Sequence, residues 1–349
     1  MQNIELNKTD SISIFADKNA PRKFNFAAEK FAKDKYICGH LYLEKKNALF
    51  VADSEGMVHM WKPKYDFKSE LVRSAFKAHL GPIFKFMYLK DSSLLLSGSA
   101  DRTLKLWDVW DREKSGAQCC VQTLVGHGGT VLDIAYHQGM LVSCSTDKTI
   151  RVWMSDSNRG IMLYPYYICV QVLTLPSSAP CTVVCMASSS LLSAVFIGDS
   201  EGKLHAMDKR QMDQRDLEEE KMEVLFPSPT RPPQKVHDLS VSHMYIAQAE
   251  SYLCSLSFDH TALIHEANSG NGVFGIENPS RCRYSGFAWN PVNKELFLID
   301  IKGTLQVWNC HTGACLATIK VCDGPLKSIS CDNSSRLTIC TAVSLSIYS

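Results

Sequence analysis

A ten-residue pattern occurs twice in this chain, 46 residues apart. The copies read SADRTLKLWD at 99–108 and STDKTIRVWM at 145–154, so each combines a small residue, an Asp, a turn residue, a β-rich run and a Trp. Repetition at a fixed period is the sequence signature of an array of similar structural units. This feature constrains the fold more than the composition does.

Weaker copies extend the repeat along the rest of the chain. Aligned on the aromatic residue that closes each motif, or on its substitute, the units end at Trp61, Trp107, Trp153, Met207, His265, Trp308 and Tyr348. The acidic position of the turn holds, in the same order, Glu55, Asp101, Asp147, Glu201, Asp259, Lys302 and Ala342. We therefore expect seven units, of which the second and third keep the pattern complete.

Short runs of β-branched and aromatic residues surround each motif. In the second unit they cover 83–89, 94–99 and 103–107, and Gly, Asp and Ser separate them. This composition is typical of strands joined by tight turns. About 40 to 45 residues for four strands is the period of a β-propeller blade. The expected fold is all-β, a seven-bladed β-propeller that residues 1–349 form as a single domain.

The motif residues resemble those of WD40 repeats. His79 and His127 stand where that family keeps its Gly-His signature, and Trp107-Asp108 is the dipeptide that names it. In that family a His, a strand Ser, the turn Asp and the Trp form a buried hydrogen-bond chain, because a buried carboxylate and indole N–H need partners. The resemblance implies two such sets: His79, Ser99, Asp101 and Trp107, and His127, Ser145, Asp147 and Trp153.

Ring closure requires one more strand. The seventh unit has three strands before the last residue, and an open ring would leave an unpaired edge. In WD40 proteins an N-terminal strand commonly completes the last blade, so we expect the β-type run SISIFA at 11–16 to do this. The alternative is that the sequence is one part of a longer chain.

Charge and hydropathy disfavour two classes of partner. The formal net charge of +1 predicts no bulk attraction to nucleic acid or to anionic lipid. No apolar run approaches the roughly 18 residues that span a bilayer, and the first ten residues have no hydrophobic signal core. We expect an intracellular, cytoplasmic protein.

The sequence contains 14 cysteines but no Cys-x-x-Cys pair. Cys144 and Cys254 fall inside strand patterns, where a thiol behaves as a small apolar residue, and Cys181 with Cys185 is the nearest approach to a ligand pair. We expect reduced thiols, as in the cytosol, and no metal site. His237 and His243 lie six residues apart, and His237 is better interpreted as the structural His of the fifth unit than as a metal ligand.

Motifs of catalysis and cofactor binding are largely missing. The sequence has no phosphate-binding GxxxxGK[ST], no HExxH and no GxSxG. Gly270 to Gly275 match GxGxxG, but the match follows a strand and leads to another strand rather than to a helix, so a hairpin turn is the better interpretation. We expect no enzymatic activity, no cofactor and no small-molecule substrate.

Two insertions interrupt the regular spacing, at about 155–180 and 209–233. The first contains Tyr164, Tyr166 and Tyr167, which predict either an exposed aromatic anchor for a partner or the outer strand of the third blade with its connection. The second combines charged residues with a Pro-rich run, and it predicts either a solvated loop or a docking arm with a modifiable Ser228-Pro229 site.

The residue before each turn acid usually points toward the central channel in propellers of this kind. These positions hold Ser54, Ala100, Thr146, Ser200, Phe258 and Ile301. Phe258 is the candidate partner-binding residue among them. The Arg cluster that phosphopeptide recognition requires is missing.

The leading hypothesis is a non-enzymatic scaffold subunit that binds other proteins in a large assembly. Segments such as LFLIDIKGTLQVWN (296–309) are similar in style to WD40 proteins of cilia and axonemes, which makes the cilium the candidate location. One alternative is a substrate receptor of a ubiquitin ligase, although Trp107-Asp108 is not followed by the Trp-Asp-x-Arg pattern of many such receptors. The other is an RNA-processing or ribosome-assembly propeller, which would need a local basic patch.

Overall fold

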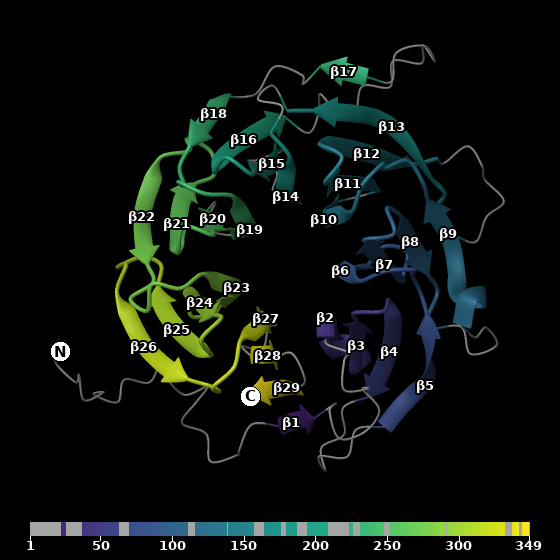
Figure 1. Ribbon diagram of the computed structural model, residues 1–349, viewed down its shortest axis with the longest axis horizontal. Coiled ribbons are helices and arrows are strands. Elements are labelled where there is room, and N and C mark those ends of the chain that lie inside the picture. Colours follow the sequence, from purple (N-terminus) through teal and green to yellow (C-terminus); the bar gives the residue numbers. More distant parts are fainter. Residues whose placement is uncertain are drawn as a thin grey trace.

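Seven β-sheets form a ring around a central opening in the computed structural model (Figure 1). Each sheet is one blade, with its first strand at the centre of the ring and its last strand at the rim. The expected all-β propeller is confirmed. The structure describes residues 22–25, 37–62, 70–110, 116–137, 139–156, 164–175, 179–186, 194–208, 223–225, 231–247, 252–290, 292–331, 337–341 and 344–348.

The first three blades follow the repeat closely. Blade one contains β2 (Ile37–Leu43), η3 (Glu44–Lys46), β3 (Ala48–Asp53), β4 (Met57–Lys62) and β5 (Glu70–Lys77). Blade two contains β6 (Ile83–Leu89), β7 (Leu94–Ser99), β8 (Leu104–Trp107), η4 (Gly116–Cys119) and β9 (Cys120–Leu124). Blade three contains β10 (Val131–His137), β11 (Met140–Ser145), β12 (Thr149–Ser155), β13 (Tyr167–Thr174) and the added strand β17 (Glu223–Leu225).

The remaining blades repeat this antiparallel order. Blade four contains β14 (Cys181–Met186), β15 (Ala194–Asp199), β16 (Lys203–Asp208) and β18 (Arg231–Lys235). Blade five contains β19 (Val241–Ala247), β20 (Tyr252–Ser257), β21 (Thr261–Glu266) and β22 (Gly272–Glu277). Blade six contains β23 (Tyr284–Asn290), β24 (Glu295–Asp300), β25 (Thr304–Asn309) and β26 (Cys315–Lys320). Blade seven contains β27 (Leu326–Cys331), β28 (Leu337–Thr341), β29 (Ser344–Tyr348) and β1 (Arg22–Asn25).

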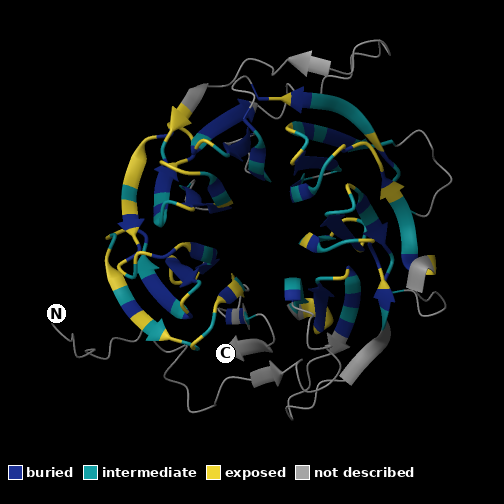
Figure 2. Ribbon diagram, viewed as in Figure 1, coloured by how far each residue is buried: buried dark blue, intermediate teal, exposed yellow. Residues whose placement is uncertain are grey.

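The hydrophobic core lies between neighbouring blades. One cluster joins blades one and two around Phe50 and Trp107, and the next joins blades two and three around Leu96 and Trp153. The second strand of a blade is covered on both faces, so every residue of β7, β11 and β15 is buried (Figure 2). Each blade therefore depends on its two neighbours for the burial of its apolar surface. Among the described residues, no helix has the length and hydropathy to cross a membrane.

Strand β1 completes blade seven. It pairs antiparallel with β29, with Arg22 opposite Ile347 and Asn25 opposite Ser344. The closing strand is thus Arg22–Asn25 and not the expected run at 11–16, which lies outside the described residues. The four residues RKFN have weak strand propensity, and their pairing is decided by the free edge of β29. At the boundary between blades seven and one, which we call the seam of the ring, the Oγ of Ser328 lies 2.5 Å from Nδ1 of His40.

Both insertions contribute strands to the ring. The first one supplies β13, the outer strand of blade three, so the second of the two interpretations of this segment is correct. The second insertion supplies β17, which pairs parallel with β13 (Glu223 opposite Val172), and its last residues begin β18 of blade four. Ser228 lies outside the described residues.

Gly202 should be indispensable for the turn between β15 and β16. Its φ is +81°, and a Cβ atom there would lie 2.2 Å from the carbonyl oxygen of His237. We expect Gly202→Ala to lower the free energy of unfolding by roughly 2–4 kcal/mol, because the backbone of two neighbouring segments has to move. Urea unfolding measures this. Gly272→Ala is the matched control, since nothing lies within 4 Å of its Cβ position, and equal midpoints for the two variants would contradict the expectation.

Candidate interaction face and the hydrogen bonds that shape it

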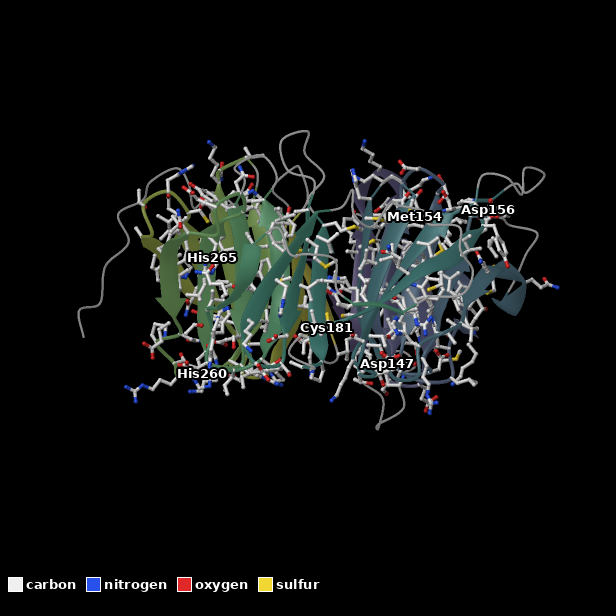
Figure 3. The ribbon with its side chains drawn as sticks, turned by 90° about the horizontal axis from the view of Figure 1, so that it is seen from above. Asp147, Met154, Asp156, Cys181, His260 and His265 are labelled. Carbon is white, nitrogen blue, oxygen red and sulfur yellow. The ribbon has the colours of Figure 1, made fainter. Side chains whose placement is uncertain are left out.

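One face of the ring is built from two kinds of connection. The turns between the second and third strands and the loops that lead from one blade into the next both lie on it. Figure 3 shows this edge-on: Asp147 and His260, from two such turns, lie at one edge of the molecule, and Met154 and Asp156 lie at the other. We call the face with Asp147 and His260 the loop face.

A continuous hydrogen-bond chain crosses blade two beneath this face. His79 lies with Nδ1 2.9 Å from Oδ2 of Asp101 and Nε2 2.7 Å from Oγ of Ser97. The indole Nε1 of Trp107 donates to the same Ser97 Oγ at 2.8 Å. Because a carboxylate only accepts, His79 donates from Nδ1, accepts from Ser97 at Nε2, and leaves Ser97 to accept from Trp107.

Blade three repeats the chain with the same geometry. His127 Nδ1 lies 3.1 Å from Asp147 Oδ2, and its Nε2 lies 2.8 Å from Ser143 Oγ. Trp153 Nε1 donates to Ser143 at 2.9 Å. The structure thus brings together the His, Asp and Trp of both expected sets.

The serine predicted for each set is wrong, because the bridging serine lies two residues earlier in the chain. Ser97 and Ser143 occupy the bridging position, whereas Ser99 and Ser145 lie at the strand ends and accept hydrogen bonds from the backbone N–H groups of Asp101 and Asp147 at 3.2 Å. Residues two apart on a strand point to the same face, so the sequence pattern alone did not distinguish them.

Blade five contains a third set without a Trp. His237 Nε2 lies 2.8 Å from Ser255 Oγ, and its Nδ1 lies 3.3 Å from Asp259 Oδ2. The Trp position is taken by His265, which is also buried. The interpretation of His237 as a structural residue agrees with this geometry, whereas His243 lies exposed on β19.

In blades one, four and six, the turn is held by an Asp that lies at a different position from Asp101 and Asp147. In blade four, Asp199 accepts from the N–H groups of Glu201 and Lys203 and lies 2.9 Å from Nε2 of His205. Asp53 in blade one and Asp300 in blade six accept from the equivalent N–H groups of their turns. The repeat pattern predicts this role for Glu55 and Glu201, two residues later, and this prediction is wrong. The missed signal is Asp-x-x-Gly, which ends at Gly56, Gly202 and Gly303, all with positive φ.

Burial and hydrogen bonding fix the charge of each set. Burial lowers the pKa of His79 and His127 below the ordinary 6.5, although Asp101 and Asp147 act in the opposite direction. Burial would raise the pKa of Asp147, but the bonds from Thr149 and from the N–H of Gly128 outweigh it and lower the pKa to about 2. At neutral pH each set therefore holds a carboxylate and a neutral imidazole.

Stability should fall as the pH drops below 6.5. A His with a lower pKa in the folded state stabilises fully above its unfolded pKa, and this contribution is lost as the pH falls. Burial lowers the pKa of His79, His127 and His237, so all three contribute to the loss. The lowered pKa values of Asp101 and Asp147 add to it below about pH 4. Thermal unfolding between about pH 7.5 and about pH 4.5 measures the effect, and a melting temperature that rises on acidification would contradict it.

The tyrosines of the first insertion do not form an exposed anchor. Tyr167 is buried, and its backbone N–H and C=O both bond to the side-chain amide of Gln122 in blade two. Tyr164 donates to Asp108, also in blade two, and Tyr166 is half-buried. These residues connect blades two and three, which explains why aromatic side chains are found in a connection.

Phe258 lies on the loop face, with 40% of its surface exposed. The guanidinium carbon of Arg283 lies 5.5 Å from the centre of its ring, at cation–π distance. Leu239, in the loop that leads into blade five, is 53% exposed. This part of the face offers an apolar surface for contact with a partner.

Among the cysteine side chains that the structure describes, no two form a disulfide with each other. Burial raises the pKa of Cys169 above its ordinary value of 9.0, so this thiol resists ionisation. Within the part of the chain that the structure describes, no group of three or more His, Cys, Asp or Glu residues is arranged to hold a metal ion.

Comparison with known sequences finds a family motif in two stretches, which run from β5 of blade one to the third strand of blade three. The family model described as WD domain, G-beta repeat matches residues 69–108 and 118–154. Nuclear distribution protein PAC1-2 of Uncinocarpus reesii is 41% identical over 71 residues, 20% of this chain and 14% of that protein. Ribosome biogenesis protein YTM1 of Coccidioides immitis is 27% identical over 120 residues, 34% of this chain and 24% of that protein. The chain thus spans less than a quarter of the length of these two relatives.

A solved structure extends the likeness to the whole ring. The WD40 β-propeller domain of Doa1 superposes with a TM-score of 0.69, over 93% of this chain and 96% of that one, at 16% sequence identity. The ring of sheets has the fold of a WD40 β-propeller, and WD40 repeats match the residues that contain the His–Ser–Asp–Trp sets of blades two and three.

Proposed function

We propose that this propeller is a non-enzymatic scaffold subunit that binds other proteins within a multiprotein assembly. The supporting observation is a contrast on the loop face. Its turn carboxylates and their histidines are engaged in hydrogen bonds within blades, whereas large apolar side chains are exposed. The exposed side chains are Leu80 (86%), Val125 (72%), Leu239 (53%) and Phe258 (40%). Such a surface is suited to contact with partners.

The rigidity of the face strengthens this proposal. Each turn of blades two and three is held at both carboxylate oxygens, so its loops keep one shape before a partner arrives. A binding surface that is already ordered loses little conformational entropy on association.

We also propose a cytoplasmic setting for the assembly, with the ciliary axoneme as the candidate structure. The support is the irregular repeat spacing and the residue choice of segments such as 296–309, which are similar to WD40 proteins of cilia.

Ribosome assembly is the second candidate. Its support is the 27% identity to a ribosome biogenesis protein over 120 residues. This candidate predicts that the partners depend on RNA.

Affinity purification tests both. The tagged chain is recovered from ciliated and non-ciliated cells, with and without ribonuclease treatment. The scaffold proposal predicts a stoichiometric set of proteins that resists ribonuclease, and the ciliary setting predicts that the set is richer in ciliated cells. Partners lost on ribonuclease treatment would favour ribosome assembly, and a chain recovered alone would contradict the scaffold.

A further inference from the structure

The loop-face end of blade two exposes an unusual amount of apolar surface. Leu80 and Val125 are the two most exposed large apolar side chains among the described residues, at 86% and 72%. Phe84, the second residue of β6, is 46% exposed. Single exposed apolar side chains need no explanation, but a group of three at one end of one blade does.

Backbone contacts place Leu80 and Val125 at the same end of blade two. The N–H of Leu80 donates to Oδ2 of Asp101 at 3.0 Å, which places Leu80 beside the turn that contains Arg102. Val125 directly follows Leu124, which pairs with Leu104 on the adjacent strand. Leu80 and Val125 therefore both lie beside the turn between β7 and β8.

Four cations lie at the loop-face ends of blades two and three. Arg102 and Lys148 are exposed in the turns of blades two and three. The Nζ of Lys105 donates to the carbonyl of Ala78 at 2.9 Å, and a Cβ atom on Gly126 would lie 2.6 Å from Nη1 of Arg151. We call the following seven residues the blade-two patch: Leu80, Phe84, Val125, Arg102, Lys105, Lys148 and Arg151.

The acids of these turns do not neutralise the patch by direct pairing. Each oxygen of Asp101 already accepts two hydrogen bonds, Oδ1 from the N–H and Oγ1 of Thr103, and Oδ2 from His79 and Leu80. Asp147 is occupied in the same way. Since a carboxylate has about four acceptor sites, neither has one left for a cation. Within the described residues, no carboxylate lies within ion-pair distance of the four cations.

The combination of exposed aliphatic side chains and cations favours one chemical class of partner. Exposed cations attract carboxylates, and aliphatic side chains gain by burial against other apolar groups. A single-stranded nucleic acid would instead need several aromatic faces on which successive bases stack, and Phe84 is the one aromatic residue among the seven of the patch. We propose that the blade-two patch binds an acidic segment of a partner protein that also carries apolar side chains. This inference rests on the proposed scaffold function and specifies its partner.

A displayed library of random peptides tests the proposal on the full chain. The patch variants are Leu80→Asp/Val125→Asp and Arg102→Glu/Lys148→Glu. Their matched controls are Val292→Asp, 63% exposed in the first turn of blade six, and Lys90→Glu, exposed in the first turn of blade two; both lie on the opposite face. Circular dichroism verifies that all four variants fold.

We expect the wild-type chain to enrich peptides in which Asp or Glu adjoins Leu, Ile, Val or Phe. Both patch variants should bind the enriched peptides at least about tenfold more weakly, and the controls should stay within about twofold. Enrichment of neutral or basic peptides, equal binding by the patch variants, or tighter binding of a polyuridine oligonucleotide would overturn the proposal.

Purification of the same variants from cells separates this proposal from the scaffold function. Loss of partners from both patch variants supports the patch. If the patch variants keep the full set of partners, the patch is not the docking site, while the scaffold function stands. If the wild-type chain recovers no partners, the scaffold function fails whatever the peptides show.

Discussion

Deleting residues 1–25 should lower the free energy of unfolding by roughly 2–4 kcal/mol, because the four paired residues of β1 lose backbone hydrogen bonds worth about 1 kcal/mol each. The loss has a second component. β1 belongs to blade seven but is followed in the chain by blade one, so it is the covalent tie across the seam of the ring. Without it, the boundary between blades one and seven keeps side-chain contacts such as that of His40 with Ser328.

A shorter deletion is the matched control. Removal of residues 1–20 leaves β1 intact and should leave the unfolding midpoint unchanged, although it removes the run at 11–16. Equal destabilisation by the two deletions would show that the closing strand lies in the first 20 residues. Equal stability of the longer deletion and the full chain would show that the ring does not need β1.

Trp107→Ala should lower the free energy of unfolding by about 4 kcal/mol. The indole is 2% exposed, packs on Phe76 with ring centres 5.3 Å apart, and donates to Ser97. Its removal therefore leaves a cavity between blades one and two and ends the hydrogen-bond chain.

Trp107→Phe separates these two contributions. The ring bulk stays and the N–H donor is lost, so we expect a cost of about 1–2 kcal/mol. Trp110→Ala is the control, because Trp110 is half-buried and its Nε1 has no acceptor among the residues that the structure describes. Urea unfolding measures all three. A Phe variant as unstable as the Ala variant would mean that the hydrogen bond, and not the packing, dominates.

The strongest repeats were the easiest to predict. Blades two and three keep the complete motif, and the resemblance to WD40 repeats predicted the pairing of their His, Asp and Trp residues correctly. The bridging serines were not, because Ser97 and Ser99 share one face of β7 and only the register decides which of them meets Trp107.

The acid that holds the turns of blades one, four and six could be identified only from the structure. There Asp199 and its equivalents act from the end of the second strand, and the glutamate at the expected acidic position of blades one and four is exposed. The Asp-x-x-Gly signal was present but has no meaning until the turn geometry is known. Tyr167 was equally ambiguous, because a cluster of tyrosines around a Pro predicts a connection as readily as a strand that contacts Gln122.

The sequence also did not predict where the charged side chains gather on the surface. A net charge of +1 gave no reason to expect a basic surface. The blade-two patch arises because the acids nearest to it are occupied by hydrogen bonds of their own blades, which depends on three-dimensional contacts.

Photo-crosslinking from the loop face tests the central claim most directly. A benzoylphenylalanine in place of Leu80, and in a second chain in place of Val292, is activated in living cells, and the adducts are identified by mass spectrometry. The account predicts crosslinks from position 80 to defined partner proteins through acidic segments, and few from position 292 on the opposite face. Equal crosslinking from both positions, or adducts with nucleic acid at position 80, would contradict it.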